Sequence, residues 1–134
     1  MIMYALDTNI ITYILKGDQE VFDRYCKEAE QGNEFVFPPI VYFEIRRWFL
    51  ALGSKNKALA FEEMCQAIPL GDLNRQIWDV AANLYVQARK TGRPVDDSDL
   101  IIAAFCLVNE YVLVTHNTRH FENIDGLIIV DWKS

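Results

Sequence analysis

Short apolar segments that alternate with helical segments constrain the fold of this chain more than any other feature. Four of them have the length and apolar content of buried strands: "IMYALD", "EFVFP", "YVLVTHN" and "LIIVDW", with "IPLGD" as a fifth candidate. Strands separated by helices favour a parallel sheet with helices on both faces. We therefore expect an α/β fold whose central, twisted and mostly parallel sheet has about four or five strands.

Capping residues mark where the helices begin. Thr8 or Asn9 can cap a helix over "IITYILKG", Asp18 can cap "QEVFDRYCKEAEQ", and Pro39 can occupy the first turn of "IVYFEIRRWFLALG". Three more helices are expected: "KNKALAFEEMCQAI" after Ser54, "RQIWDVAANLYVQARKTG" after Asp72 or Asn74, and a helix through "DLIIAAFCLVNE" that starts at Asp97 or Ser98. No linker or repeat interrupts this pattern, which predicts a single domain over residues 1–134.

Composition excludes several classes of protein. A chain that is 51% hydrophobic and 24% charged can bury a core, and no apolar run approaches the roughly 20 residues that span a bilayer. The start "MIMYALDTNI" lacks a basic region, which favours the cytoplasm. Three widely spaced cysteines among apolar neighbours indicate buried free thiols. The net charge of −6 argues against a general nucleic-acid binder but permits an enzyme that reaches phosphates through a metal cation.

Polar residues follow two of the predicted strands directly. Asp7 closes the first strand, and the group Thr115–His116–Asn117 ends a later one. In parallel sheets, ligands bind beyond the carboxyl ends of the strands, so these side chains are expected at one edge. Asp7 has an alternative role as the cap of the helix that follows it.

Four acids on the helices add to this edge. Glu44 stands in an apolar helix, where a buried, unpaired glutamate is costly, so it either pairs with Arg46 or Arg47, lies on a partly exposed face, or is compensated by a bound cation. "PVDDSD" at 94–99 crowds three aspartates before an uncharged run. Asp96 and Asp99 have the spacing of a capping box, which accounts for part of that cluster. Two like charges about 4 Å apart repel by roughly 4 kcal/mol at a dielectric of 20, so the cluster destabilises the metal-free fold or raises some carboxyl pKa values unless a divalent cation binds.

Two histidines lie near the last two strands. His120 precedes apolar Phe121, and a lone histidine is more often structural than catalytic; the same holds more strongly for His116, expected on the rim. No Ser–His–Asp arrangement, glycine-rich phosphate loop or zinc spacing occurs in the chain.

Four sequence blocks stand in a recognisable order: "LDTNI" at 6–10, Glu44, "GRPVDDSDLIIAA" at 92–104 and "LVTHNTRHFENIDGLIIVDW" at 113–132. Over nearly its whole length the chain resembles the PIN-domain ribonucleases, specifically the VapC toxins of bacterial toxin–antitoxin pairs. The resemblance implies a three-layer PIN-like fold. It also implies that Asp7, Glu44 and Asp99 bind Mg²⁺, or Mn²⁺, and that the ion activates water for in-line attack on an RNA phosphodiester.

The chain departs from the family at the fourth polar position. Many relatives carry Asp or Glu before the phenylalanine, whereas this chain has His120. Asn117, Thr115 or Asp96 can take over that role. Relatives often carry Ser and Thr shortly before the second acid, where this chain has Pro39 and Val41. The candidates for holding RNA are Arg46, Arg47, Arg93 and Arg119, with Thr115 and His120 beside them; ordinary solvated surface is the alternative for the arginines.

The resemblance further implies partners. VapC toxins form homodimers and are neutralised by a VapB antitoxin, whose tail fills a groove near the active site. Apolar side chains on the third and fourth helices are candidates for such a surface, with core packing as the alternative: Tyr42, Trp48, Phe49, Leu52 and Phe61.

Two other functions compete with a ribonuclease that cleaves transfer RNA or another structured RNA and so inhibits translation and growth. One is a PIN scaffold without catalysis, which His120 favours and the retained acids oppose. The other is a phosphoacceptor receiver domain, which needs paired acids after the first strand. Only Asp7 stands there, and the late strands offer only Lys133 past their end.

Overall fold

A computed structural model describes residues 1–134 as an α/β fold with four strands and seven helices. The strands are β1 (Met3–Leu6), β2 (Glu34–Val36), β3 (Val112–Val114) and β4 (Ile129–Val130). The helices are α1 (Thr8–Leu15), α2 (Gln19–Glu30), α3 (Pro39–Leu52), α4 (Lys55–Ala67), α5 (Arg75–Lys90), α6 (Asp97–Asn109) and α7 (Thr118–Phe121). No helix combines the length and the apolar character that a membrane crossing requires.

The four strands form one parallel sheet in the order β2-β1-β3-β4. This confirms the predicted parallel sheet at the lower end of its expected strand number. The fifth candidate, "IPLGD", is not a strand: it contributes a single bridge between Leu70 and Phe37. Because β1 is central and pairs with β3, Leu6 stands opposite Val114, and the residues that follow these two strands become neighbours.

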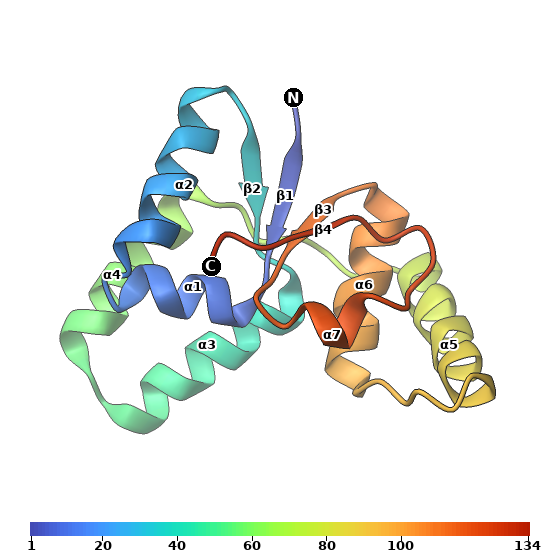
Figure 1. Ribbon diagram of the computed structural model, residues 1–134. Coiled ribbons are helices and arrows are strands. Elements are labelled where there is room, and N and C mark those ends of the chain that lie inside the picture. The colour runs from blue at the N-terminus through green and yellow to red at the C-terminus, as the bar shows by residue number, and fades with distance from the viewer.

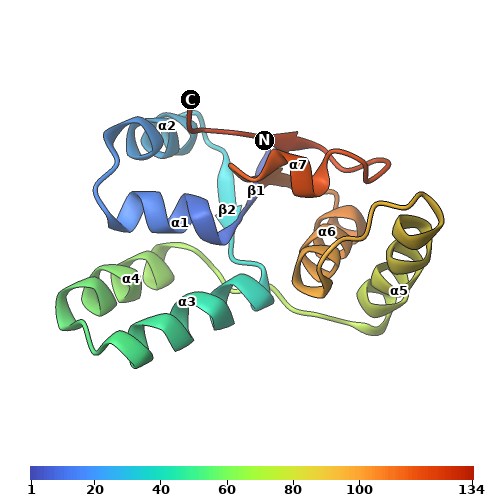
Figure 2. The same cartoon turned by 60° about the horizontal axis from the view of Figure 1, so that its bottom comes forward.

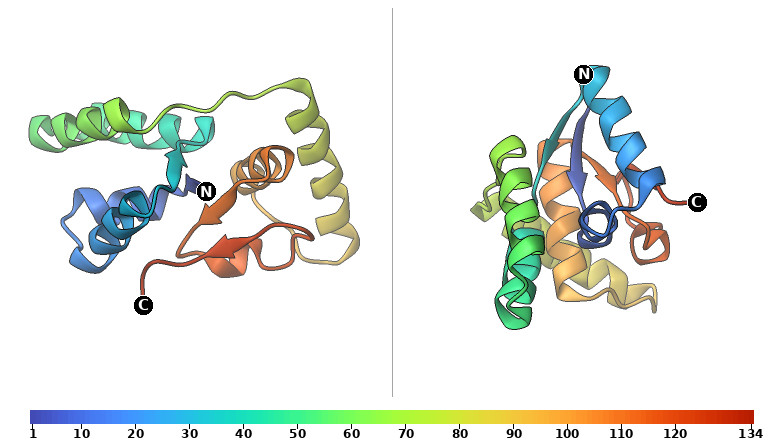
Figure 3. Two further views of the ribbon diagram at one scale, coloured as in Figure 1. Left: turned by 90° about the horizontal axis from the view of Figure 1, so that it is seen from above. Right: turned by 90° about the vertical axis from the view of Figure 1, so that its left-hand side faces the viewer.

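Helices cover both faces of the sheet, as predicted. Figure 3 shows α1 and α2 on one side of the strands and α3, α4 and α6 on the other. In Figure 1, α5 lies outside α6, and α7 lies below the end of the sheet. Figure 2 shows α3 and α4 side by side as a helical hairpin, with Gly53 ending α3 in the left-handed conformation at φ 66°.

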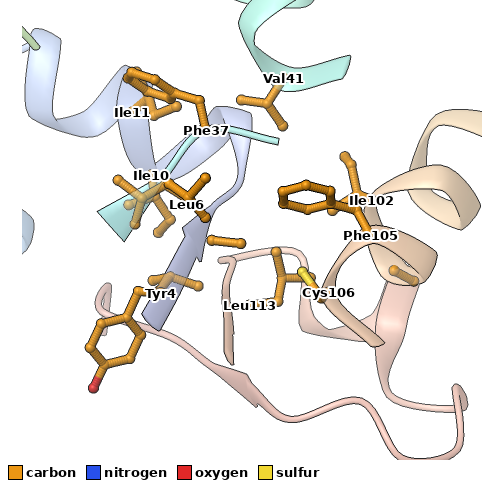
Figure 4. Close-up of a cluster of buried hydrophobic side chains, with 14 of the residues drawn as sticks. Tyr4, Leu6, Ile10, Ile11, Phe37, Val41, Ile102, Phe105, Cys106 and Leu113 are labelled. Carbon is orange, nitrogen blue, oxygen red and sulfur yellow. The ribbon is translucent and has the colours of Figure 1, made fainter. Parts of the chain in front are cut away.

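A single hydrophobic cluster of 27 buried residues joins these layers. Figure 4 shows side chains of β1, α1, α3, α6 and β3 meeting in it, including Leu6, Ile10, Val41, Phe105 and Leu113. The uncharged run of α6 supplies six buried residues, which explains why the segment carries no charge after its first turn. The core therefore fixes the start of α6, and with it the acids of "PVDDSD", against the sheet.

The helix starts agree with the predicted caps at Asp18, Ser54 and Asn74, and α3 begins at Pro39. The expected cap at Thr8 or Asn9 was wrong, and the alternative role given to Asp7 is confirmed, since its carboxylate caps α1 by accepting a hydrogen bond from the backbone N–H of Thr8. Asp96 takes the cap position of α6 without a side-chain hydrogen bond, so the expected capping box with Asp99 does not form.

Candidate functional site

Asp7 is the most buried acid at the carboxyl edge of the sheet. The residue is only 5% exposed, and its carboxylate accepts hydrogen bonds from three donors. Oδ1 accepts from the Thr8 N–H at 2.8 Å, while Oδ2 accepts from Thr115 Oγ1 at 2.8 Å and from Asn9 Nδ2 at 3.4 Å. Burial raises the pKa of the Asp7 carboxyl, and the hydrogen bonds from Thr115 and Thr8 oppose that rise. The carboxylate is therefore fixed in orientation.

Thr115 links this acid to the neighbouring strand. It follows β3 directly, is fully buried, and accepts a 3.0 Å hydrogen bond from the Asn117 N–H while donating to Asp7. A direct contact of Thr115 with substrate does not fit this burial. The structure gives it a different role, which is to position Asp7.

Asp99 and Glu44 reach the same place from two helices, α6 and α3. Burial is the main cause that raises the pKa of each carboxyl, and the charge of Asp7 is the second. The charge of Asp99 raises the pKa of Glu44 further. The structure therefore brings three carboxylates from distant segments within electrostatic range of one another at the sheet edge, where the sequence predicted Asp7, Glu44 and Asp99.

No arginine forms an ion pair with Glu44. Arg46 pairs with Glu62 of α4, and its guanidinium lies 5.3 Å from the centroid of the Tyr42 ring. Arg47 stacks over Phe43 at 5.1 Å and lowers the pKa of Glu44 only through its charge. Arg46 is thus engaged by α4, and the structure does not bring it to the acids, so the alternative of an Arg46–Glu44 ion pair was wrong.

A cavity of about 810 Å³ opens beside Asp99. The end of α5, the start of α6 and α7 line it, and its charged lining includes Asp96, Asp99, Lys90, Arg93, Arg119 and His120. The Arg93 guanidinium donates to Asn123 Oδ1 at 2.6 Å across this cavity. Arg93 and Arg119, both predicted from the sequence, therefore stand beside the acids, whereas Lys90 and Asn123 were missed because nothing local marks them.

A second cavity, of about 640 Å³, lies on the other side of Glu44 between α1 and α3. Thr8, Thr12 and Lys16 line it from α1. The Thr8 hydroxyl is buried without a hydrogen-bond partner. Asp99 therefore lines one open space and Glu44 the other, and Thr8, with its unsatisfied oxygen, lines the same cavity as Glu44.

The two histidines differ in what they contact. His116 Nδ1 lies 2.9 Å from Asp131 Oδ2, and its ring meets Tyr13 edge-on, which agrees with the structural role expected of it. His120 Nδ1 lies 3.0 Å from Asp99 Oδ2, so the histidine reaches the acid cluster itself. Asn117 precedes α7, and its backbone N–H donates a hydrogen bond to the Thr115 hydroxyl. Its side chain makes no hydrogen bond that caps the helix.

The donor set suits a hard divalent cation. Carboxylate oxygens are the preferred ligands of Mg²⁺ and Mn²⁺, and a carboxylate with about four lone-pair sites keeps one free at Asp7 after its three hydrogen bonds. The Thr8 hydroxyl adds an unsatisfied oxygen. No three acid, histidine or cysteine side chains converge closely enough to enclose an ion by themselves. An ion held here would need water or substrate oxygens to complete its ligand set.

Comparison with known proteins identifies the class that this fold and site define. The family model for the PIN domain matches residues 4–127. Ribonuclease VapC1 of Haemophilus influenzae (strain R2866) is 31% identical over 133 residues, which cover 97% of this chain and 98% of that protein. The chain therefore belongs to the PIN-domain family and, within it, to the VapC group.

Further relatives agree with this membership. The tRNA(fMet)-specific endonuclease VapC of Shigella flexneri is 25% identical over 134 residues, covering 99% of this chain and 100% of that protein. The structure of VapBC-1 from nontypeable Haemophilus influenzae superposes with a TM-score of 0.85 at 30% identity, covering 99% of this chain and 100% of that one. VapBC2 from Rickettsia felis, bound to a promoter DNA fragment, gives a TM-score of 0.87 at 22% identity, covering 98% and 100%.

Proposed function

We propose that this protein is a metal-dependent endoribonuclease and the toxin of a VapBC-type pair. The observation that carries the proposal is the cluster of Asp7, Glu44 and Asp99 at one sheet edge, where the charge of Asp7 raises the pKa of both other carboxyls and no arginine or lysine forms an ion pair with any of the three. Such a cluster is costly in isolation and is stabilised by a divalent cation. The names of the VapC relatives as ribonucleases support the activity.

The residues have distinct roles in this proposal. Asp7, Glu44 and Asp99 hold Mg²⁺ or Mn²⁺, and Asp96, exposed on the cavity rim, orders the outer water shell. A divalent ion in such a site lowers the pKa of water and stabilises charge on phosphate oxygens. Thr115 holds Asp7 in orientation, and the Asn117 amide, at the start of α7, orients water or the scissile phosphate.

Arg93 and Arg119 are the residues that hold the RNA backbone. Both line the cavity that begins at Asp99, and Lys90 adds a third positive charge there. An RNA strand that entered the cavity would run from these basic side chains to the acids, where the bound cation would reverse the negative local charge. Transfer RNA or another structured RNA is the substrate we favour, and its cleavage would inhibit translation and growth in the cytoplasm.

A VapB-type antitoxin is the proposed partner, because the solved relatives are named as VapBC assemblies. The α3–α4 hairpin leaves large apolar side chains in solvent, namely Phe43, Leu50, Leu52 and Leu59. Of the residues suggested by the sequence, only Leu52 is among them; Phe49 and Phe61 are buried in the core, and Tyr42 and Trp48 pack against it. This hairpin surface would contact either the second protomer of a homodimer or the antitoxin.

RNA cleavage by the purified chain tests the proposal. Wild-type protein should cleave RNA with Mg²⁺ or Mn²⁺ and stop when the metal is chelated. Asp99→Asn should lose at least a hundredfold in rate. Asp97→Asn is the matched control, since Asp97 lies two residues away on the exposed face of α6 and should leave the rate unchanged. Equal rates for Asp99→Asn and wild type would refute the assignment of Asp99.

The contact between His120 and Asp99 favours a second candidate, a PIN scaffold that binds RNA or a partner without catalysis. In that case the imidazole would permanently replace the cation beside Asp99. Calorimetric titration with Mn²⁺ separates the two functions, because a scaffold would bind no metal.

A further inference from the structure

His120 is held in a defined position beside the acids. Its backbone N–H donates to the Asn117 carbonyl at 3.0 Å, and the next residue, Phe121, is 1% exposed and anchored in the core. The imidazole itself is half exposed and lines the cavity shared with Asp99. A short anchored helix therefore presents one ring nitrogen, Nδ1, to Asp99 Oδ2 at 3.0 Å.

His120 also affects Asp7, another carboxylate of the cluster. Its charge lowers the pKa of Asp7 as well as that of Asp99, so the ring lies where a positive charge favours both ionised carboxylates. The other histidine of the chain, His116, is engaged with Asp131 and Tyr13. His120 is thus the charged side chain that favours the ionised form of both Asp7 and Asp99.

The spacing of the two atoms suits a shared ion. Ligand atoms about 2.1 Å from an octahedral ion and at right angles to each other lie about 3.0 Å apart. Nδ1 and Oδ2 already have that separation. An ion could therefore replace the hydrogen bond between them without separating the two atoms, once the imidazole turns Nδ1 from Oδ2 toward the ion and any shared proton leaves to solvent.

We propose that His120 Nδ1 binds the same divalent ion as Asp99, so that the centre has a mixed nitrogen and oxygen ligand set. Imidazole ligands favour first-row transition dications over Mg²⁺, so the centre selects Mn²⁺ over Mg²⁺. This rests on the proposed metal-dependent function and adds to it the identity of a ligand and the preferred ion.

Pulsed electron paramagnetic resonance of the Mn²⁺-loaded, full-length chain tests the ligand directly. Protein labelled with ¹⁵N-histidine should show a directly coupled ¹⁵N nucleus. His120→Ala should lose that coupling, while His116→Ala, which removes the only other histidine, should retain it. Bound Mn²⁺ without nitrogen coupling in the wild type, or coupling that persists in His120→Ala, would overturn the inference.

Metal selectivity provides a second readout, by calorimetry with Mn²⁺ and Mg²⁺ separately. The ratio of the Mg²⁺ to the Mn²⁺ dissociation constant should fall about tenfold or more in His120→Asp, which keeps an ionisable ligand but supplies oxygen. An unchanged ratio would overturn the role of His120. Failure of the proposed function would look different: wild-type protein would bind no Mn²⁺ at all, whereas Mn²⁺ bound through oxygen alone overturns only the inference about His120.

Discussion

Thr115 Oγ1 donates a 2.8 Å hydrogen bond to Asp7 Oδ2 and so ties together two residues that are 108 positions apart in the chain. Each residue directly follows a strand, and the two strands are neighbours in the parallel sheet. The same hydroxyl accepts from the Asn117 N–H at 3.0 Å. One buried threonine therefore orients both the first acid and the loop that leads to His120.

Replacing Thr115 by valine should destabilise the protein and slow RNA cleavage. Valine has nearly the same shape, but it leaves the Asn117 N–H without its acceptor and removes the shorter of the two hydrogen bonds to Asp7 Oδ2. A buried polar group without its partner costs about 1–3 kcal/mol. We expect that loss in the free energy of unfolding, measured with urea, and a slower cleavage rate because Asp7 loses its fixed orientation.

Thr115→Ser is the matched control, since it keeps the hydroxyl and removes only a methyl group. It should retain most of the cleavage rate and lose stability only on the scale of one buried methyl group, about 1 kcal/mol. If valine and serine gave the same rate, the hydroxyl would have no part in positioning Asp7.

Glu44→Gln should stabilise the metal-free protein at neutral pH. Burial, followed by the charges of Asp7 and Asp99, raises the pKa of Glu44, and no hydrogen bond opposes this. A carboxyl whose pKa is higher in the folded than in the unfolded state stabilises the fold fully at a pH below its unfolded-state pKa, ordinarily 4.5. That stabilisation is lost as the pH rises through the folded-state pKa. Removing the charge should therefore gain about 0.2–1 kcal/mol after solvent screening.

The pH and metal dependence of that gain distinguish it from a general effect of the substitution. The difference between variant and wild type should disappear as the pH falls below 4.5, where both are neutral at this position. Saturating Mg²⁺ should reverse the order, because the wild type then gains the binding free energy of the ion. Exposed Glu63→Gln should show neither behaviour.

Several parts of this site follow from the sequence by simple physical rules. Asp7 and Thr115 were expected together because the carboxyl ends of parallel strands share one edge. Glu44 was expected there because an apolar helix cannot bury an unpaired carboxylate without compensation. The acids of "PVDDSD" followed from the helix start, since the uncharged run after them has to be buried and carries its first turn to the sheet, while the resemblance to the PIN-domain family singled out Asp99 among them.

Other parts depend on packing between elements that have no local signal. Arg46 stands two positions after Glu44 and so faces another side of α3, where the close approach of α4 offers it Glu62 and the Phe61 ring. The contact of His120 with Asp99 requires α7 to pack on α6, and nothing in "TRHF" reveals it. The failed capping box has the same origin, because Asp99 turns toward His120 rather than back to the start of its own helix.

Cys106 should resist thiol reagents in the folded protein. It is fully buried in α6, and burial together with the charge of Asp7 raises the pKa of its thiol far above the ordinary value of 9.0. Cys26 and Cys65 are half buried and should react first. Mass spectrometry after a brief pulse of reagent should show at most two labels at neutral pH and three in concentrated urea; rapid labelling of Cys106 without denaturant would contradict its burial.

Arg93→Gln should weaken RNA binding while leaving the chemical step intact. Arg93 lines the cavity beside Asp99, but its guanidinium is held by Asn123 and touches none of the acids. Loss of one screened phosphate contact costs about 1 kcal/mol, so KM should rise roughly fivefold at constant kcat. The slope of binding affinity against salt concentration on logarithmic scales should fall by about one. Exposed Arg75→Gln, at the opposite end of α5, should change neither quantity. A fall in kcat at constant KM would instead place Arg93 in the catalytic step.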